Sequence, residues 1–97
     1  MKDLFDVSGK VALVTGGSRG IGEMIAEGYV THGVKTYISA RKAEACDATA
    51  ARLSEIGECI SIPADLSTAD GIAALVEQVR NREDRLDILV NNAGAAW

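Results

Sequence analysis

The chain has 97 residues, room for one domain, and its 47% hydrophobic and 25% charged residues are typical of a folded globular protein rather than a disordered one. The net charge of −4 comes without a stripe of basic residues, so we expect neither nucleic acid nor an anionic membrane as a partner. No apolar run is long enough to span a bilayer, and the N-terminus lacks a secretory signal, which favours a cytoplasmic location.

The first predicted strand is the β-branched apolar run Val11 to Thr15, which ends at two glycines and is expected to be buried on both faces. A helix should follow, and its apolar face is predicted to comprise Ile21, Met24, Ile25, Gly28 and Tyr29. Gly33 supplies a C-terminal stop for this helix. Residues 34–40 then form a second predicted strand.

Residues 42–56 are predicted to form a second helix, whose apolar face comprises Ala43, Cys46, Ala50 and Leu53. A third strand is expected over residues 59–64, near the only proline, Pro63, where a missing N–H does least damage. Neither cysteine belongs to a C-x-x-C or a metal-type spacing, so Cys46 and Cys59 are expected to be buried reduced thiols, with no metal site.

Ser67 with Asp70 three residues later resembles a capping box for a third helix. The apolar stripe behind it comprises Ile72, Leu75, Val76 and Val79. The charges between Arg80 and Arg85 have mixed signs, which indicates a solvated loop. Residues 86–90 form the fourth predicted strand, which ends at the segment NNAG, 91–94.

The resulting βαβαβαβ order predicts a parallel α/β sheet of the Rossmann type, with strand order 3-2-1-4 and helices on both faces. Residues 1–97 would then be the N-terminal part of one doubly wound dinucleotide-binding domain, without its C-terminal catalytic part. In this truncated domain the fourth strand is expected to have an open edge.

The segment TGGSRGIG, residues 15–22, lies between the first predicted strand and helix. Gly16 suits a sharp turn, Gly20 allows the main chain to approach a pyrophosphate closely, and Gly22 permits close packing of helix on strand. The free N–H groups and the dipole at the start of the helix favour an anion. The segment therefore predicts a site for the pyrophosphate of a dinucleotide.

Other interpretations of this turn exist because its spacing, G-x-x-x-G-x-G, differs from the fingerprint G-x-G-x-x-G. The structural alternative is a tight turn without a ligand. A P-loop fits less well, because Glu23 and Met24 stand where its lysine should follow. A methyltransferase also has such a turn, but the acidic residue usual at the end of its second strand is missing here.

A NAD site has an acidic residue at the end of the second strand, where it binds the ribose 2′-hydroxyl. This chain has Ala40 there, followed by Arg41, and Arg19 projects from the glycine turn. Two guanidinium groups would attract a 2′-phosphate, which favours NADP(H) over NAD(H). The alternative is that both arginines are merely exposed. Asp65, after the third strand, can accept a hydrogen bond from the adenine amino group or cap the following helix.

With TGGSRGIG, Asp65-Leu66 and NNAG in this order and spacing, the whole chain resembles the short-chain dehydrogenases/reductases. Within that family it is most similar to the NADPH-dependent 3-oxoacyl reductases of the rhamnolipid-biosynthesis type. The resemblance implies a cofactor site in which the pyrophosphate meets Gly16, Ser18, Gly20, Ile21 and Gly22. It also places the 2′-phosphate at Arg19 and Arg41, the adenine at Asp65 and Leu66, and the ribose and nicotinamide at Asn91, Ala93 and Gly94. Thr15 would hold the NNAG turn against the first strand.

The family's catalytic serine, Tyr-x-x-x-Lys pair and asparagine normally lie beyond the NNAG turn. Tyr29 is followed four residues later by Gly33, and Tyr37 by Arg41, so we expect no catalytic residue and no activity in this chain alone. The resemblance implies that the full-length protein is a homo-oligomeric oxidoreductase. It would transfer hydride between NADPH and a carbonyl or alcohol substrate, such as a 3-oxoacyl thioester. The alternative is a non-catalytic, truncated nucleotide-binding module.

Overall fold

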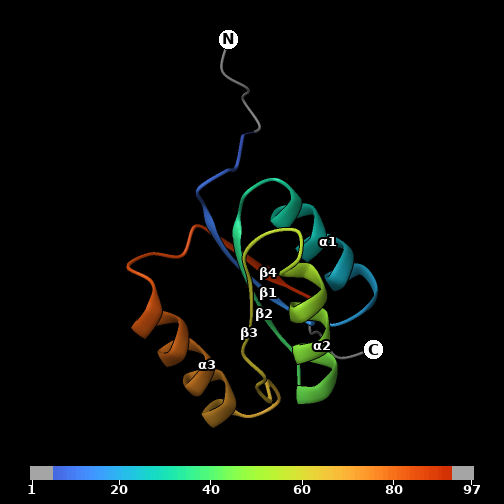
Figure 1. Cartoon of the computed structure of the whole chain (residues 1–97). Helices are drawn as coiled ribbons and strands as arrows, with labels where there is room; N and C mark the ends of the chain where they lie inside the picture. The colour runs from blue at the N-terminus through green and yellow to red at the C-terminus, as the bar shows by residue number, and fades with distance from the viewer. Residues whose placement is uncertain (1–5, 93–97) are drawn as a thin grey trace.

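The computed structural model describes residues 6–92, in which strands and helices alternate along the chain (Figure 1). The elements are β1 (Val11–Thr15), α1 (Gly20–Thr31), β2 (Lys35–Ser39), α2 (Ala43–Leu53), β3 (Cys59–Ser61), α3 (Ala69–Arg82) and β4 (Ile88–Asn91). The strands pair in parallel in the order β3-β2-β1-β4. The predicted Rossmann-type α/β class and strand order are therefore confirmed.

The sheet separates the helices into two layers, with α1 and α2 on one face and α3 on the other (Figure 1). The core between the sheet and α1 and α2 contains Val14, Ala26, Val30, Ile38, Cys46, Ala50, Leu53 and Cys59. The core on the face of α3 contains Val11, Leu13, Tyr37, Ile62, Leu75 and Val79. Successive strand residues point to opposite faces, so both layers draw on the same apolar strands.

Strand β1 lies between β2 and β4, and all five of its residues are buried, as predicted. Strand β4 pairs with β1 alone among the described strands, and Leu89 in it is 63% exposed. The open edge expected for the fourth strand is thus present in residues 6–92. The central position of β1 places the glycine turn that follows it in the middle of the sheet's carboxyl edge.

The apolar face predicted for the first helix is wrong in part. Ile21 and Met24 are 68% and 73% exposed, whereas the buried residues of α1 are Gly22, Ala26 and Val30. These buried residues recur every four positions and therefore share one face of the helix, of which Ala26 and Val30 belong to the core against the sheet. Of the predicted face, Gly28 is also exposed, and Ile25 and Tyr29 contact the core as half-buried side chains.

The face predicted for the second helix is confirmed at Cys46, Ala50 and Leu53, but Ala43 is exposed and Thr49 is buried instead. Both cysteines are buried and free of any disulfide, as predicted. Burial raises the pKa of both thiols, that of Cys59 to about 11. Helices long and apolar enough to cross a membrane are absent from residues 6–92.

Helix α3 begins one residue later than its predicted capping box. The cap is Thr68, whose Oγ1 accepts a hydrogen bond from the N–H of Gly71 at 2.9 Å, so Ser67 and Asp70 do not form the box. The stripe is buried only at Leu75 and Val79, because α3 meets the sheet along a narrow strip. Its other predicted members are about half exposed, Ile72 at 47% and Val76 at 53%.

The prediction of a solvated loop over residues 80–85 is confirmed in that all of these residues except Glu83 are exposed, but it is wrong in two respects. Its first residues continue α3 as far as Arg82, and the side chain of Glu83 is only 12% exposed. The Glu83 carboxylate lies 2.6 Å from Lys35 Nζ and accepts a hydrogen bond from the Tyr37 hydroxyl. Glu83 therefore ties the end of α3 to β2, which no local charge pattern could indicate.

Strand β3 ends at Ser61, three residues before the predicted end at residue 64, but hydrogen bonds to β2 continue beyond Ser61. The N–H of Ile62 donates to Ile38 at 2.9 Å, and that of Ala64 to Ala40 at 3.1 Å. Pro63 lies between these two donors, at a position whose N–H would point to the outer edge. This is the physical reason why a proline is tolerated there.

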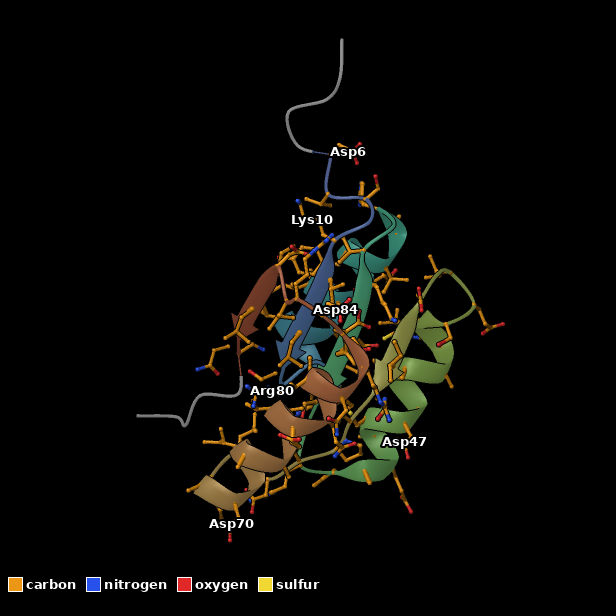
Figure 2. The ribbon with its side chains drawn as sticks, turned by 90° about the vertical axis from the view of Figure 1, so that its left-hand side faces the viewer. Asp6, Lys10, Asp47, Asp70, Arg80 and Asp84 are labelled. Atoms are coloured by element: carbon orange, nitrogen blue, oxygen red, sulfur yellow. The ribbon has the colours of Figure 1, made fainter. Side chains whose placement is uncertain are left out.

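Charges of both signs are spread over separate elements. Asp47 lies on α2, whereas Asp70 and Arg80 lie near opposite ends of α3, across the sheet from it (Figure 2). Lys10 lies just before β1, at the amino end of the sheet (Figure 2).

Candidate cofactor-binding site

The segments predicted to contact a cofactor follow the carboxyl ends of four parallel strands. Thr15 at the end of β1 is in register with Ser39 of β2 and with Asn91 of β4. The glycine turn and the loops after β2, β3 and β4 therefore leave the same edge of the sheet. The strand order also reverses beside β1, and ligands of open α/β sheets bind at such a switch point.

The glycine turn contains two residues in the left-handed region, Gly16 with φ of 69° and Gly20 with φ of 60°. This backbone conformation is costly for residues that carry a Cβ atom. The N–H of Gly16 donates to the Ser39 carbonyl at 2.7 Å, which ties the start of the turn to β2. The sharp turn expected at Gly16 is thus present.

Gly22 is buried where α1 meets the start of the turn. A Cβ atom on it would lie 2.0 Å from the carbonyl oxygen of Gly16 and 2.8 Å from Asn92 Nδ2. Real Cβ contacts are never so short, so only glycine fits. The expected close packing is confirmed, although Gly22 meets the turn and the end of β4 rather than the body of a strand.

The N–H groups of α1 before that of Glu23 have no hydrogen-bond partner within residues 6–92. Arg19 is the N-cap residue with extended angles, and its side chain makes no capping hydrogen bond. The first intrahelical donor is the N–H of Glu23, which bonds the Arg19 carbonyl at 3.3 Å. A Cβ on Gly20 would meet nothing within 4 Å, so the side of Gly20 on which a side chain would stand is open. The helix end therefore fits a pyrophosphate.

Arg19 and Arg41 are both exposed, and neither forms an ion pair within residues 6–92. Arg52 of α2, by contrast, pairs with Glu23 at 2.6 Å and Glu27 at 3.1 Å. Two unpaired guanidinium groups thus stand beside the carboxyl edge, one after β1 and one after β2. Their charge suits a dianionic phosphate group.

Asp65 organises the loop between β3 and α3. Its Oδ1 accepts hydrogen bonds from the hydroxyl and the N–H of Ser67, at 2.6 and 3.0 Å. These bonds lower the pKa of Asp65, and the charge of Arg41 adds a smaller effect in the same direction. The alternative that Asp65 caps α3 is wrong, because Thr68 is the cap. Leu66 is half-buried and packs against the core on the α3 face.

The Thr15 hydroxyl joins the end of β1 to the end of β4. Its Oγ1 lies within donating distance of the Asn91 side-chain oxygen, at 3.1 Å, and of the Val90 carbonyl, at 3.3 Å. It also accepts a hydrogen bond from the N–H of Asn92 at 3.0 Å. The role expected for Thr15 is therefore confirmed for the first two residues of NNAG. Ala93 and Gly94 lie outside the described residues.

Two contacts that shape the turn could not be found from sequence motifs. The Ser39 carbonyl holds Gly16, and the Thr49 hydroxyl of α2 donates to the Ser18 carbonyl at 2.9 Å. A lone threonine in a helix gives no signal for such a bond, because its partner is distant in sequence and the bond exists only once α2 has packed.

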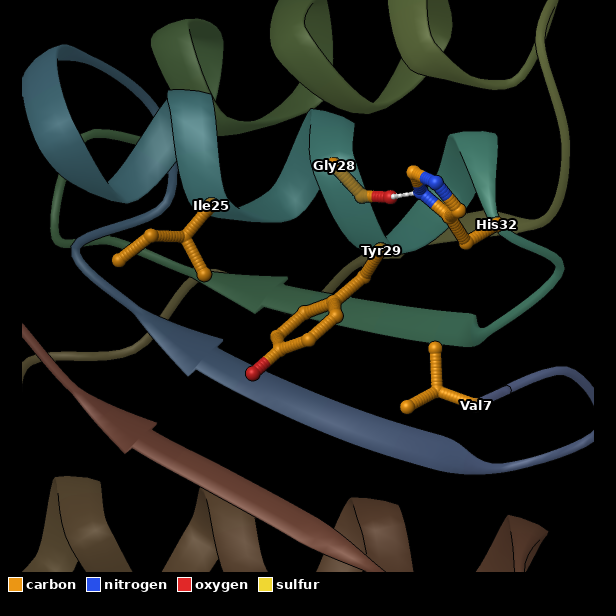
Figure 3. A pocket seen from close by; sticks show the side chains of 5 residues that line it. All are labelled: Val7, Ile25, Gly28, Tyr29 and His32. Atoms are coloured by element: carbon orange, nitrogen blue, oxygen red, sulfur yellow. Dashed lines mark hydrogen bonds between the residues drawn. The ribbon is translucent and has the colours of Figure 1, made fainter. Parts of the chain in front are cut away.

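A shallow pocket of about 370 Å³ lies elsewhere, between α1 and the segment before β1 (Figure 3). It is lined by Val7, Ile25, Gly28, Tyr29 and His32. The Nδ1 atom of His32, the residue after α1, lies 2.7 Å from the Gly28 carbonyl oxygen, so that nitrogen is engaged by the last turn of α1. The pocket includes no residue predicted to contact a cofactor.

Parallel strands in the order β3-β2-β1-β4, with a glycine turn at the switch point, define a Rossmann-type chain. The family model described as short chain dehydrogenase matches residues 10–97. The chain belongs to the short-chain dehydrogenase family, as its motifs predicted.

Among its relatives is the Rhamnolipids biosynthesis 3-oxoacyl-[acyl-carrier-protein] reductase of Pseudomonas aeruginosa, which is 54% identical over 97 residues. That match covers all of this chain and 38% of the reductase. The structure of the Pseudomonas aeruginosa RhlG/NADP active-site complex has a TM-score of 0.91 at 54% identity, over 95% of this chain and 37% of that one. L-sorbose reductase from Gluconobacter frateurii, complexed with NADPH and L-sorbose, has a TM-score of 0.88 at 40% identity, over 94% and 35%. The chain thus spans little more than a third of these relatives.

Proposed function

We propose that this chain is the NADP(H)-binding part of a short-chain oxidoreductase that transfers hydride between NADPH and a carbonyl or alcohol substrate. One observation carries the proposal. Within residues 6–92, a helix terminus without a side-chain cap lies behind a glycine turn, at the same sheet edge as two guanidinium groups that form no ion pair, those of Arg19 and Arg41. This arrangement offers backbone donors for a pyrophosphate and cations for a further phosphate.

The pyrophosphate would be held by the turn from Gly16 to Gly22, including Ser18 and Ile21. The open space at Gly20 and the free donors of the first helical turn support this assignment. Gly22 contributes indirectly, because its missing side chain lets the helix terminus lie against Gly16. Asp65 and Leu66 would meet the adenine, and Asn91, Ala93 and Gly94 the ribose and nicotinamide.

Preference for NADP(H) over NAD(H) is proposed from the 2′-phosphate position. Ala40 stands where an acidic residue would repel that phosphate, and Arg41 follows it. The relatives whose structures were obtained with NADP or NADPH support the same cofactor. Both arginines would bind the phosphate by charge-assisted hydrogen bonds.

When bound, the nicotinamide cofactor supplies or accepts the hydride. The residues of this chain would bind and orient it, whereas proton transfer to the substrate oxygen would need an acid such as the tyrosine of a Tyr-x-x-x-Lys pair, a motif that does not occur in residues 1–97. We therefore propose that the chain alone is inactive, and that the full-length protein carries the Tyr-x-x-x-Lys pair elsewhere. A 3-oxoacyl thioester is the proposed substrate class, on the strength of the Pseudomonas relative. A homo-oligomeric state and a cytoplasmic location stay predictions.

The cofactor assignment is tested in the full-length protein with Arg41→Asp. Loss of a charge-assisted contact of about 1.5–3 kcal/mol should weaken NADPH binding roughly 10- to 150-fold in calorimetry, and NADH binding far less. Arg80→Asp is the matched control, because Arg80 is an exposed arginine on α3. Equal losses for both cofactors would refute the 2′-phosphate role of Arg41.

The reaction is tested by turnover of the full-length protein with NADPH on 3-oxoacyl thioesters and a wider set of ketones. Oxidation of NADPH that depends on one of these substrates supports the oxidoreductase assignment. Tight NADPH binding without turnover on any of them would instead favour a non-catalytic nucleotide-binding module.

A further inference from the structure

Thr49 makes a hydrogen bond that its place in the middle of α2 does not require. The residue is 7% exposed, and its Oγ1 donates to the carbonyl of Ser18 in the glycine turn at 2.9 Å. Helical threonines commonly bond a carbonyl of their own helix, one turn back. This hydroxyl instead connects α2 to a loop 31 residues earlier in the chain.

The bond fixes the middle of the turn, whose two ends are held in other ways. At the start, the N–H of Gly16 bonds the Ser39 carbonyl of β2. At the far end, Gly22 packs directly against the Gly16 carbonyl. Between these points, Ser18 is held by Thr49. Without that hydroxyl, the Ser18 carbonyl would lose its partner, and the peptide that follows could rotate.

Rotation of this peptide matters because Arg19 comes next. A trans peptide is planar, so the Arg19 N–H points away from the Ser18 carbonyl and thus away from α2. Arg19 then continues with φ of −162° and ψ of 169°, before the left-handed Gly20 starts the helix. The direction of the Ser18 carbonyl therefore sets where the Arg19 side chain leaves the backbone.

Helix α2 is also the element that follows Arg41. It is fixed to β2 by the Cys46 thiol, 3.5 Å from the Ile38 carbonyl, and to α1 by the ion pairs of Arg52. Thr49 thus links the helix next to one guanidinium to the turn that carries the other. The two arginines come from separate loops, one before α1 and one before α2, and Thr49 joins α2 to the first of these loops.

We propose that Thr49 is a positioning residue for cofactor selection: its hydrogen bond to Ser18 keeps Arg19 aligned with Arg41, so that both act on one phosphate. The inference rests on the proposed NADP(H) site and deepens it. A threonine distant from the cofactor would then influence discrimination between phosphorylated and unphosphorylated dinucleotides, without touching either.

The test compares Thr49→Val, which removes the hydroxyl at nearly constant volume, with Thr49→Ser, which keeps it. The dissociation constants of NADPH and NADH are measured by calorimetry on the full-length protein. Loss of one hydrogen bond of about 1 kcal/mol corresponds to a change of roughly fivefold in a dissociation constant. Thr49→Val should therefore raise the dissociation constant of NADPH about fivefold and that of NADH less than twofold. Thr49→Ser, which keeps the hydroxyl, should keep the wild-type ratio of the two dissociation constants.

Thr36→Val is the control for loss of a buried threonine hydroxyl. Thr36 is fully buried in β2, and its Oγ1 donates to the nearby Val34 carbonyl at 3.0 Å, away from the carboxyl edge. The Thr36→Val variant should change the unfolding midpoint but not the ratio of the dissociation constants of NADPH and NADH. If Thr49→Val does not fold, the ratio is measured on Thr49→Ala.

Each outcome has one meaning. A wild-type protein that does not prefer NADPH refutes the proposed function itself. A wild-type preference that survives removal of the Thr49 hydroxyl, or equal losses for NADPH and NADH in that variant, overturns the positioning role and leaves the NADP(H) site intact.

Discussion

Gly22 and Gly28 lie in the same helix, α1, but their surroundings are opposite. A Cβ atom on Gly22 would come 2.0 Å from the Gly16 carbonyl oxygen and 2.7 Å from its carbon, whereas one on Gly28 would meet nothing within 4 Å. Alanine at either position gains the same helix propensity, about 0.5–1 kcal/mol over glycine. The pair of variants Gly22→Ala and Gly28→Ala therefore isolates the packing at the glycine turn.

The expected loss of unfolding free energy in Gly22→Ala follows from the clash of the new Cβ atom with the Gly16 carbonyl. Contacts below 3.0 Å force atoms to move, and here the partner is backbone in a turn whose own angles need glycine, so the helix must shift by roughly 1 Å. Overpacking of this kind costs about 1–3 kcal/mol. We expect Gly28→Ala to raise the free energy of unfolding by about 0.5–1 kcal/mol, and Gly22→Ala to lie about 1–3 kcal/mol below it.

The measurement is urea unfolding of both variants and the wild type, with equal m-values required for the comparison. NADPH affinity is measured on the same samples, because displacement of the helix terminus should also weaken pyrophosphate binding. If Gly22→Ala is as stable as Gly28→Ala, the close contact with Gly16 is not a constraint, and the account of the turn fails.

Two further predictions concern side chains that join elements distant in sequence. Thr15→Val should lower the free energy of unfolding by about 1 kcal/mol, because the Asn92 N–H loses its acceptor, while Thr15→Ser should keep most of the stability in the same urea assay. Glu83→Gln removes a carboxylate whose pKa is lowered by hydrogen bonds from Lys35 and then Tyr37. A depressed pKa stabilises the fold above the ordinary glutamate range and loses this effect as the pH falls through the folded value. The variant should thus be about 1 kcal/mol less stable than the wild type at pH 7, and the gap should close in acid; an equal gap at pH 7 and pH 3 would contradict the ion pair's role.

Strands and helices were predictable where the local sequence pattern matches the burial that the tertiary structure imposes. Val11 to Thr15 is apolar throughout, and a central parallel strand needs both faces apolar, so its bounds were found to the residue. Helix faces were less predictable. Periodicity placed Ile21 and Met24 in the core because they are large and apolar, but the buried residues of α1 are Gly22, Ala26 and Val30. The apolar pattern alone does not tell which side of a helix packs most closely.

The conformation of the glycine turn was predictable because its backbone constraints are local. Gly16 and Gly20 need left-handed angles, and a glycine-rich turn between strand and helix is the simplest sequence that provides them. The contacts that hold the turn from outside were not predictable, because no sequence pattern surrounds Thr49 or Ser39. The contacts of Glu83 were equally unpredictable, because in the sequence it is one charge in a run of mixed signs.

The sequence by itself thus determined the α/β order, the parallel sheet and the residues that surround the glycine turn, since each follows from periodicity or from the conformational freedom of glycine. Only the tertiary structure decided which helix faces are buried, which residue caps α3, and which distant groups hold the turn. Those outcomes depend on contacts between elements far apart in the chain, such as Thr49 with Ser18 and Glu83 with Lys35. Such contacts exist only after the elements have packed, so no local pattern encodes them.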